Sequence, residues 1–274
     1  MINRVVIVGS GALATFYAYK WSRDFYVSVL GSWKESISAI NLFGQHQSNR
    51  KLTANLDWGK TKEPDLVVWL TKTYKNKSSL MNYAKLNWRC PVLILQNGIG
   101  QESLFQDFLG ENQKIIRGVT NQGAKLMDPG NVLNTGDGEI IVEKDNLFNN
   151  FPVVQVNNIQ TMVYNKLAIS SVLNPTCALF GVSNKNATIG EPGKHLKKMV
   201  NLCFPFFKKR KVFDSEKEYL EHVESVARKT GDNLNSMLVD FKSNRKTEVS
   251  EILAPINNEL KSAELTRIIN LLNS

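Results

Sequence analysis

The feature that most constrains the fold is the start of the chain, where a short apolar run meets a glycine-rich turn. Residues 5–8 are Val, Val, Ile and Val, and they are followed directly by Gly9-Ser10-Gly11-Ala12-Leu13-Ala14. This is Gly-x-Gly-x-x-Ala between a buried strand and a helix, the pattern of a dinucleotide-binding turn. The first glycine permits the tight turn, the second lets backbone approach a pyrophosphate, and the third small residue lets helix and strand pack closely. The sequence therefore predicts that Gly9, Ser10, Gly11, Ala12 and Leu13 bind a nicotinamide dinucleotide.

The rest of the first half alternates short apolar runs with helical patterns, as β-α-β units do. The candidate strands are rich in β-branched residues and cover residues 5–8, 26–30, 66–70, 92–96 and 115–119. Such continuous apolar strands are typical of a parallel sheet covered on both faces. A Gly- and Asn-rich segment over 122–143, with a turn signal at Asp128-Pro129-Gly130, predicts a hairpin added to the edge of this sheet. Residues 153–156 predict one last strand.

The pattern is helical from about residue 157 onward. Helical periodicity covers residues 162–180, 192–207, 215–224, 233–241, 248–253 and 260–272. The predicted fold class is an α/β Rossmann-type doubly wound sheet followed by an all-α C-terminal domain. We expect residues 1–157 to bind the cofactor and residues 158–274 to form a helical domain for substrate binding and catalysis.

Composition narrows the classes of protein. The chain has 274 residues, 42% of them apolar and 22% charged, which is typical of a soluble globular protein. No apolar stretch approaches the roughly 20 residues that span a bilayer, so no membrane partner is expected. The net charge is +9, but the basic residues are dispersed, and the densest run (208–211) lacks a nucleic-acid-binding motif. We interpret that run as a solvated turn and expect no nucleic-acid partner, whereas a positive field would suit an anionic cofactor and substrate.

The cysteines and the N-terminus bear on compartment and metal content. Cys90, Cys177 and Cys203 form an odd set without the spacing of metal ligands. The chain enters its first strand with no room for a signal peptide. We therefore predict a reduced, cytoplasmic setting and no metal site, with Cys177 in the core rather than a nucleophile.

The end of the second strand bears on the choice of dinucleotide. A protein that selects NAD usually carries an acidic residue there to hold the ribose 2′-hydroxyl. This chain instead has Gly31-Ser32-Trp33-Lys34, with no acid before Glu35. A hydroxyl and an ammonium favour a 2′-phosphate, so Ser32 and Lys34 predict NADP(H). Trp33 fits either an adenine contact or a packing role.

Polar residues also recur in the helical half. Lys166, Ser170 and Asn174 are spaced at i, i+4 and i+8, which places them on one face of a helix. Such a stripe fits either a solvated face or a site, and Pro175 predicts a break or kink beside it. In the first half, Lys72 and Asn97 follow candidate strands, at the sheet edge where ligands bind in doubly wound folds.

Taken together, these residues resemble the ketopantoate reductase family, NADPH-dependent 2-dehydropantoate 2-reductases of pantothenate synthesis. The resemblance extends to about residue 255 and is carried by the order and spacing of separate motifs. They are Gly9-Ser10-Gly11, Leu70-Thr71-Lys72, Gln96-Asn97-Gly98-Ile99-Gly100, Lys166-Leu167-Ala168, Leu173-Asn174-Pro175, and Asn235-Ser236-Met237-Leu238 followed by Lys246-Thr247-Glu248.

The resemblance implies roles for matching residues. Lys166 would be the general acid, and Glu248 would orient it and contact substrate. Lys72 and Asn97 would lie beside the cofactor. The residues that the resemblance places against the substrate are Asn97, Ser170, Asn174, Asn184, Ser236 and Glu248. The substrate would be a small 2-oxo acid in a cleft between the domains, reduced by hydride from the nicotinamide while Lys166 stabilises and protonates the carbonyl oxygen.

Three departures from the family pattern keep alternatives open. Ser170 stands where many relatives have an asparagine, and no arginine stands near Ser32. The tail after Glu248 looks shortened. A reductase of another 2-oxo acid and a non-catalytic NADP-binding regulatory protein are the alternatives, although a sensor has no need of Lys166 with Glu248. Monomers and dimers both occur on this architecture, and the expectation is a homodimer.

Overall fold

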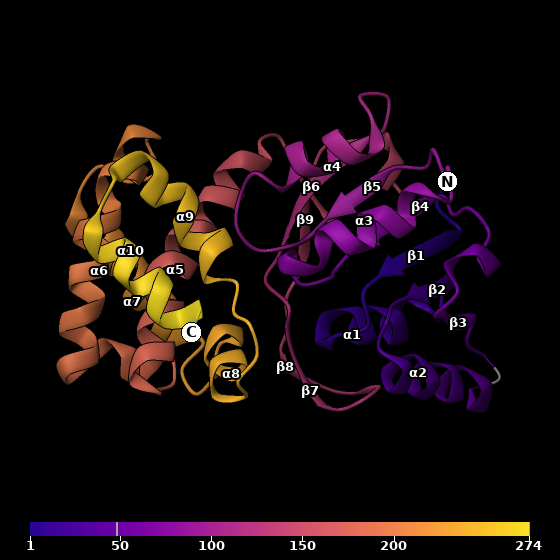
Figure 1. Ribbon diagram of the computed structural model, residues 1–274, viewed down its shortest axis with the longest axis horizontal. Coiled ribbons are helices and arrows are strands. Elements are labelled where there is room, and N and C mark those ends of the chain that lie inside the picture. Colours follow the sequence, from indigo (N-terminus) through magenta and orange to yellow (C-terminus); the bar gives the residue numbers. More distant parts are fainter. Residues whose placement is uncertain (48, 274) are drawn as a thin grey trace. The chain divides into compact units, whose positions relative to one another are not determined.

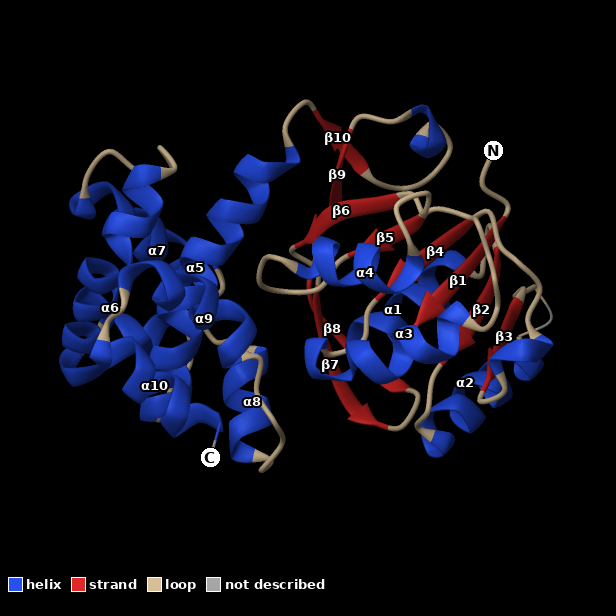
Figure 2. Ribbon diagram, turned by 45° about the horizontal axis from the view of Figure 1, so that its top comes forward, coloured by secondary structure: helices blue, strands red, loops and turns tan. Residues whose placement is uncertain are grey.

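The computed structural model describes residues 1–47 and 49–273, and its chain divides into two compact units. The first unit comprises Met1–Gln96 and Gly100–Ile159, and the second comprises Asn97–Ile99 and Gln160–Ser274. The first is built on a β-sheet (Figure 1), and the main segment of the second consists of helices joined by loops (Figure 2). The short segment Asn97–Ile99 belongs to the helical unit although the chain on both sides of it belongs to the sheet unit.

Eight strands form the main sheet, in the spatial order β10-β9-β6-β5-β4-β1-β2-β3. Their bounds are β1 (Arg4–Val8), β2 (Tyr26–Leu30), β3 (Leu52–Asn55), β4 (Leu66–Trp69), β5 (Val92–Ile94), β6 (Ile115–Thr120), β9 (Ile140–Glu143) and β10 (Val154–Val156). Strands β1 to β6 pair in parallel, whereas β9 runs antiparallel to β6 and parallel to β10. The order 3-2-1-4-5-6 is that of dinucleotide-binding doubly wound sheets, so the predicted Rossmann-type class is confirmed.

Helices cover both faces of this sheet (Figure 1). They are α1 (Ala12–Trp21), α2 (Lys34–His46), α3 (Asn76–Ala84) and α4 (Gln101–Leu109), with the short 3-10 helices η1 (Trp58–Lys60), η2 (Thr73–Lys75) and η3 (Asn146–Phe148). Alternate side chains of a strand point to opposite faces. Val5 and Ile7 accordingly lie in one core with residues of α1 and α2, whereas Val6 and Val8 lie in another with residues of α3 and α4. Both faces of β1 are buried, which explains its uninterrupted apolar sequence.

The predicted hairpin is placed wrongly in one respect. The turn at Asp128-Pro129-Gly130 is confirmed, because β7 (Gly123–Asp128) and β8 (Asn131–Gly136) pair antiparallel on either side of it. However, they form a separate two-stranded sheet, and β9 takes the place beside β6. The physical reason is burial: Ile140 and Val142 of β9 are fully buried, whereas Met127 and Leu133 of the hairpin are half exposed. The hairpin packs on α1, where the Tyr19 hydroxyl donates to the Gly130 carbonyl at 2.6 Å.

The helical unit contains seven helical segments around one hydrophobic core. They are α5 (Ile159–Phe180), η4 (Lys185–Thr188), α6 (Gly190–Lys209), α7 (Glu216–Lys229), α8 (Ser236–Lys242), α9 (Val249–Leu260) and α10 (Ala263–Asn273). Side chains cap two of the starts: Ser215 accepts from the Glu218 amide at 3.1 Å, and Asn235 accepts from the Leu238 amide at 3.1 Å. The predicted helical half is thus confirmed. Within the part of the chain that the structure describes, no helix has both the length and the apolar character needed to cross a membrane.

The basic run at 208–211 is only partly the solvated turn that we predicted. Its three lysines are exposed, but Arg210 is half-buried. The Arg210 guanidinium lies 3.5 Å from the centre of the Phe206 ring and donates to Glu259 Oε2 at 2.8 Å. This ion pair raises the pKa of Arg210 and lowers the pKa of Glu259 to about 2. Arg210 therefore joins the end of α6 to α9.

Acidification should destabilise the helical unit through His195 of α6. The His195 ring is half-buried and lies 3.0 Å from the Thr176 hydroxyl, and its burial, together with the charge of Lys198, lowers its pKa. The unfolded chain therefore binds this proton more readily, so stability is lost as the pH falls below the unfolded value of about 6.5. We expect Tm to fall by roughly 2–4 °C between pH 7.5 and 5.5 through this group. Replacing His195 with Gln should remove that part of the slope; an identical pH profile in both proteins would contradict the assignment.

Candidate active site

The turn after β1 has the geometry of a phosphate-binding loop. Gly9 has φ +126°, and a Cβ there would lie 2.9 Å from the Leu70 carbonyl carbon at the end of β4, so only glycine fits. Gly11 is the N-cap of α1 with no side-chain cap, and a Cβ on it would meet nothing within 4 Å. The first amides of α1 lack intrahelical acceptors, and its first turn carries no acidic residue. The chain thus leaves open space above a helix N-terminus, which fits an anionic pyrophosphate.

The loop after β2 supports this turn. The Ser36 hydroxyl of α2 donates to the Ser10 carbonyl at 2.8 Å, and both residues are buried. A Cβ at Gly31 would lie 2.8 Å from Ser10 Oγ, so this glycine makes room for the serine. Ser32 and Lys34 follow directly and are exposed. A hydroxyl and an ammonium therefore stand at the carboxyl end of β2, where the 2′-phosphate of NADP would lie.

Lys72 follows β4, which lies beside β1 at the switch point of the sheet, and Asn97 follows β5 in the chain. Lys72 is half-buried and is the N-cap of η2. The same strand ends and the helices that follow them carry the buried amides of Asn76, Gln96 and Gln101, which were not among the predicted site residues. The sequence feature that could have indicated them is the presence of polar residues next to the apolar runs of two strands.

The polar face predicted on α5 is present. Lys166 and Asn174 are half-buried and Ser170 is 7% exposed, whereas the intervening Leu167 and Leu173 lie in the helical core. The Ser170 hydroxyl donates back to the Leu167 carbonyl at 3.2 Å. Such a bond satisfies a short side chain locally, which holds Ser170 close to the helix.

Of the break or kink predicted at Pro175, the break is wrong, because α5 continues through the proline to Phe180. Proline removes one backbone donor, so the helix loses one hydrogen bond at this point. The residues that follow are fixed by packing, since Cys177 and Ala178 are buried in the helical core. The Thr176 hydroxyl also donates to the Val172 carbonyl at 2.7 Å and so bonds the backbone beside the proline.

Glu248 and Asn97 are brought together by the structure. Glu248 is 5% exposed at the N-cap of α9, and its Oε2 accepts a hydrogen bond from Asn97 Nδ2 at 3.2 Å. Gly98 has φ +81°, and a Cβ there would lie 2.4 Å from the Glu251 carbonyl oxygen, so this close approach requires glycine. Ile99 packs against the helical core. The segment Asn97–Ile99 is therefore fixed to the start of α9.

Lys166 and Glu248 are both supported by the core of the helical unit. Their neighbours Leu167 and Val249 are buried in that same cluster. The Thr247 hydroxyl donates to the Leu272 carbonyl at 2.9 Å and accepts from the Val249 amide at 3.3 Å, which fixes the backbone on both sides of Glu248. Both side chains are thus presented by rigid elements.

The Asn184 amide, predicted to contact substrate, has protein partners, one of which is Asn235, the residue before Ser236. Its Nδ2 donates to Thr230 Oγ1 at 2.8 Å, and its Oδ1 accepts from Cys177 Sγ at 3.6 Å and from Asn235 Nδ2 at 3.4 Å. Asn235 is the cap of α8, and the exposed Ser236 begins that helix. Asn184 thus braces the segment that carries Ser236, and its contact with substrate stays a prediction.

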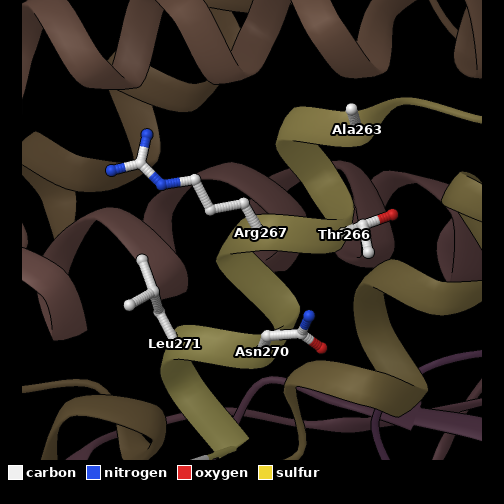
Figure 3. A pocket seen from close by; sticks show the side chains of 5 residues that line it. All are labelled: Ala263, Thr266, Arg267, Asn270 and Leu271. Carbon is white, nitrogen blue, oxygen red and sulfur yellow. The ribbon is translucent and has the colours of Figure 1, made fainter.

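Three further features bear on chemistry away from these residues: Cys177, candidate metal ligands and a pocket on α10. Cys177 is fully buried, and burial raises its pKa to about 12, so the prediction of a core residue is confirmed. Among residues 1–47 and 49–273, no group of three or more His, Cys, Asp or Glu side chains is arranged to hold a metal ion. A pocket of about 450 Å³ is lined by Ala263, Thr266, Arg267, Asn270 and Leu271, all on α10 (Figure 3). None of these is a predicted site residue.

Comparisons with known proteins match both halves of the chain. Residues 5–146 match the family model "Ketopantoate reductase PanE/ApbA", and residues 158–261 match "Ketopantoate reductase PanE/ApbA C terminal". The 2-dehydropantoate 2-reductase of Listeria innocua is 27% identical, over 92% of this chain and 88% of its own. That of Pyrococcus abyssi is 28% identical, over 98% of this chain and 95% of its own.

Solved structures show the same fold. A PanE/ApbA family ketopantoate reductase from Ralstonia eutropha superposes with a TM-score of 0.84 at 19% identity, covering 98% of this chain and 97% of its own. A D-mandelate dehydrogenase with NADH and anilino(oxo)acetate superposes with a TM-score of 0.83 at 22% identity, covering 98% of both chains. At these identities the likeness concerns the fold alone.

Proposed function

The chain belongs to the ketopantoate reductase family, and we propose on this basis that it reduces 2-dehydropantoate to pantoate with NADPH. The observation that carries the proposal is the buried Glu248 carboxylate, bonded to Asn97 in the unit that also presents Lys166. A protein that only binds a dinucleotide needs no such set. We also propose that residues 1–157 bind the cofactor and that residues 158–274 provide substrate binding and catalysis.

The cofactor would be held by the turn after β1 and by the strand ends beside it. NADPH bound there would supply the hydride for the carbonyl carbon of the substrate. The backbone of Gly9 to Leu13 would bind the pyrophosphate, because the open space at Gly11 lies above the amides of α1. Ser32 and Lys34 would bind the 2′-phosphate, and Lys72 and Asn97 would lie on the nicotinamide side.

The helical unit would supply the acid. As the substrate carbonyl is reduced, charge develops on its oxygen, and a positioned ammonium both stabilises that charge and donates a proton. We assign this step to Lys166. The Glu248 carboxylate would orient the ammonium and favour its protonated form. Hydrogen bonds to the substrate carboxylate and hydroxyl are assigned to Asn97, Ser170, Asn174, Asn184 and Ser236, some of them on α5 beside Lys166.

An assay of NADPH oxidation tests the proposal. Purified protein is incubated with ketopantoate and with a panel of other 2-oxo acids, and absorbance at the nicotinamide band is followed. We expect the highest kcat/KM with ketopantoate. Preference for another 2-oxo acid would reassign the substrate. The panel is included because Ser170 is shorter than the asparagine that many relatives have at this position. Binding of NADPH without turnover of any of them would contradict enzymatic activity.

The dinucleotide preference should depend on Lys34 and Ser32. Replacing Lys34 with Ala removes an exposed cation next to the proposed 2′-phosphate, so the Kd for NADPH should rise about 5-fold to 10-fold. Replacing Ser32 with Asp should raise it further, because a carboxylate repels the phosphate and would hold a 2′-hydroxyl instead. The Kd for NADH should change little in the first variant and fall in the second. An equal change in the Kd for both dinucleotides would contradict the assignment. The control is Lys60→Ala, at another exposed lysine of this unit, which should leave both Kd values unchanged.

Assembly and compartment follow from the same family. We propose a homodimer that acts in the cytoplasm on a small-molecule substrate. Light scattering of the purified protein measures its mass directly, and a monomer at micromolar concentration would contradict the dimer.

A further inference from the structure

Three buried amides and one half-buried threonine lie at the carboxyl ends of β4 and β5, and we call them the amide cluster: Thr71, Asn76, Gln96 and Gln101. Asn76, Gln96 and Gln101 are 1%, 5% and 8% exposed. Thr71 and Gln96 follow β4 and β5, whereas Asn76 and Gln101 begin α3 and α4. Burial of amides is costly unless each group is bonded, so a set of this size needs a reason.

The amides of Asn76 and Gln96 pair with each other in both directions. Asn76 Nδ2 donates to Gln96 Oε1 at 2.9 Å, and Gln96 Nε2 donates to Asn76 Oδ1 at 2.7 Å. Asn76 Nδ2 also donates to Gln101 Oε1 at 2.8 Å, and Gln96 Nε2 donates to the Thr71 carbonyl at 2.6 Å. The pair therefore connects the ends of two strands and the starts of two helices.

The indole of Trp69 fixes the orientation of the cluster. Trp69 Nε1 donates to Thr71 Oγ1 at 2.8 Å and lies 3.1 Å from Asn76 Oδ1. An indole N–H can only donate, so the oxygen of Asn76 must face it. That choice dictates the orientation of Gln96 in turn. A network in which every member is satisfied in one arrangement holds its segments rigidly.

Two candidate site residues follow the cluster directly in the chain. Thr71 precedes Lys72, after the strand that borders the switch point where dinucleotides bind, and Gln96 precedes Asn97. We propose that the amide cluster is a positioning device that holds the backbone of Lys72 and Asn97 for the nicotinamide half of NADPH and the substrate. This inference rests on the proposed function. Its members are positioning residues, since they act through their neighbours.

The test compares two buried amides at opposite ends of the same sheet. Asn76→Leu removes the centre of the cluster. The control is Gln113→Leu, because Gln113 is 4% exposed and its Nε2 donates to the Cys90 carbonyl at 2.6 Å, before the amino ends of β5 and β6. Four quantities are measured for each: Tm, kcat with ketopantoate, the Kd for NADPH, and the Kd for adenosine 2′,5′-bisphosphate. The last probe reports the adenosine half alone.

We expect both variants to lower Tm, because both leave buried groups unbonded. Only Asn76→Leu should weaken NADPH binding and lower kcat, each by about 10-fold or more, since a small misplacement of a site can cost up to about 100-fold. Its Kd for adenosine 2′,5′-bisphosphate should match that of the unchanged protein. If both ligands weaken equally in Asn76→Leu, or if Gln113→Leu has the same catalytic effect, the cluster is structural only and the proposal is overturned.

Two further outcomes are separable. If Asn76→Leu does not fold, Thr71→Val removes one hydroxyl of the cluster at nearly constant shape and is compared with the same control. If the unchanged protein turns over no 2-oxo acid, the proposed function fails. The contrast between NADPH and adenosine 2′,5′-bisphosphate then still decides whether the cluster positions the nicotinamide side.

Discussion

Replacing Lys166 with alanine should lower kcat with ketopantoate by about 10²-fold to 10⁴-fold, the range that a positioned general acid contributes. The Kd for NADPH should stay within about 2-fold of the original, because the pyrophosphate turn and Lys166 belong to different units. The side chain is half-buried on α5, whose apolar face is formed by its neighbours in the core, so truncation removes the ammonium without opening the core. Steady-state kinetics and cofactor titration measure the two quantities.

Two further variants separate acid catalysis from charge. Lys166→Arg keeps the positive charge, but a guanidinium does not give up its proton, so kcat should stay low. Lys198→Ala removes a lysine of the same unit that is paired with Glu264 at 2.9 Å, and it should leave kcat unchanged. Turnover close to the original in Lys166→Ala, or full activity in Lys166→Arg, would exclude Lys166 as the acid.

The strands of the sheet could be predicted from the sequence where both of their faces are buried. Strands such as β1, with Val5 to Val8 fully buried, give an apolar run that the sequence shows directly. Strand β3 was not predicted, because Leu52–Asn55 is short, polar at alternate positions and at the edge of the sheet. The sequence also did not predict that β9, rather than the β7–β8 hairpin, pairs with β6. This pairing depends on which segment buries more apolar surface beside β6, and that is a tertiary property.

The candidate site could be predicted from the sequence where its residues lie on a single helix. The i, i+4, i+8 spacing on α5 was enough to place Lys166, Ser170 and Asn174 on one face. The hydrogen bond between Asn97 and Glu248 joins residues 151 positions apart, and no local pattern contains it. The partners of Asn184 were equally hidden, since Thr230 and Asn235 are far along the chain. At Pro175 the helix does not break, because core packing on both sides of the proline outweighs one lost hydrogen bond.

Replacing Gly11 with alanine should weaken NADPH binding by about 10-fold to 100-fold, while the free energy of unfolding changes little. Gly11 has φ −85° and a Cβ there meets nothing within 4 Å, so the folded chain accepts the methyl group without strain. The same open space is where we place the pyrophosphate. A methyl group would hold the phosphates away from the amides of α1, and the loss of one charge-assisted hydrogen bond, about 1.5–3 kcal/mol, corresponds to this range. Calorimetric titration with NADPH and thermal unfolding measure the two effects.

The control is Gly136→Ala at the end of β8, where a Cβ also meets nothing within 4 Å. It should change neither Tm nor the Kd, because no ligand is placed there. Gly9→Ala provides the opposite contrast: its φ of +126° and the 2.9 Å approach to Leu70 should lower Tm as well as affinity. The two glycines differ in the space beside them, which holds protein backbone at Gly9 and is open at Gly11, where we propose that the cofactor binds. If Gly11→Ala binds NADPH as tightly as the unchanged protein does, the pyrophosphate does not lie over α1.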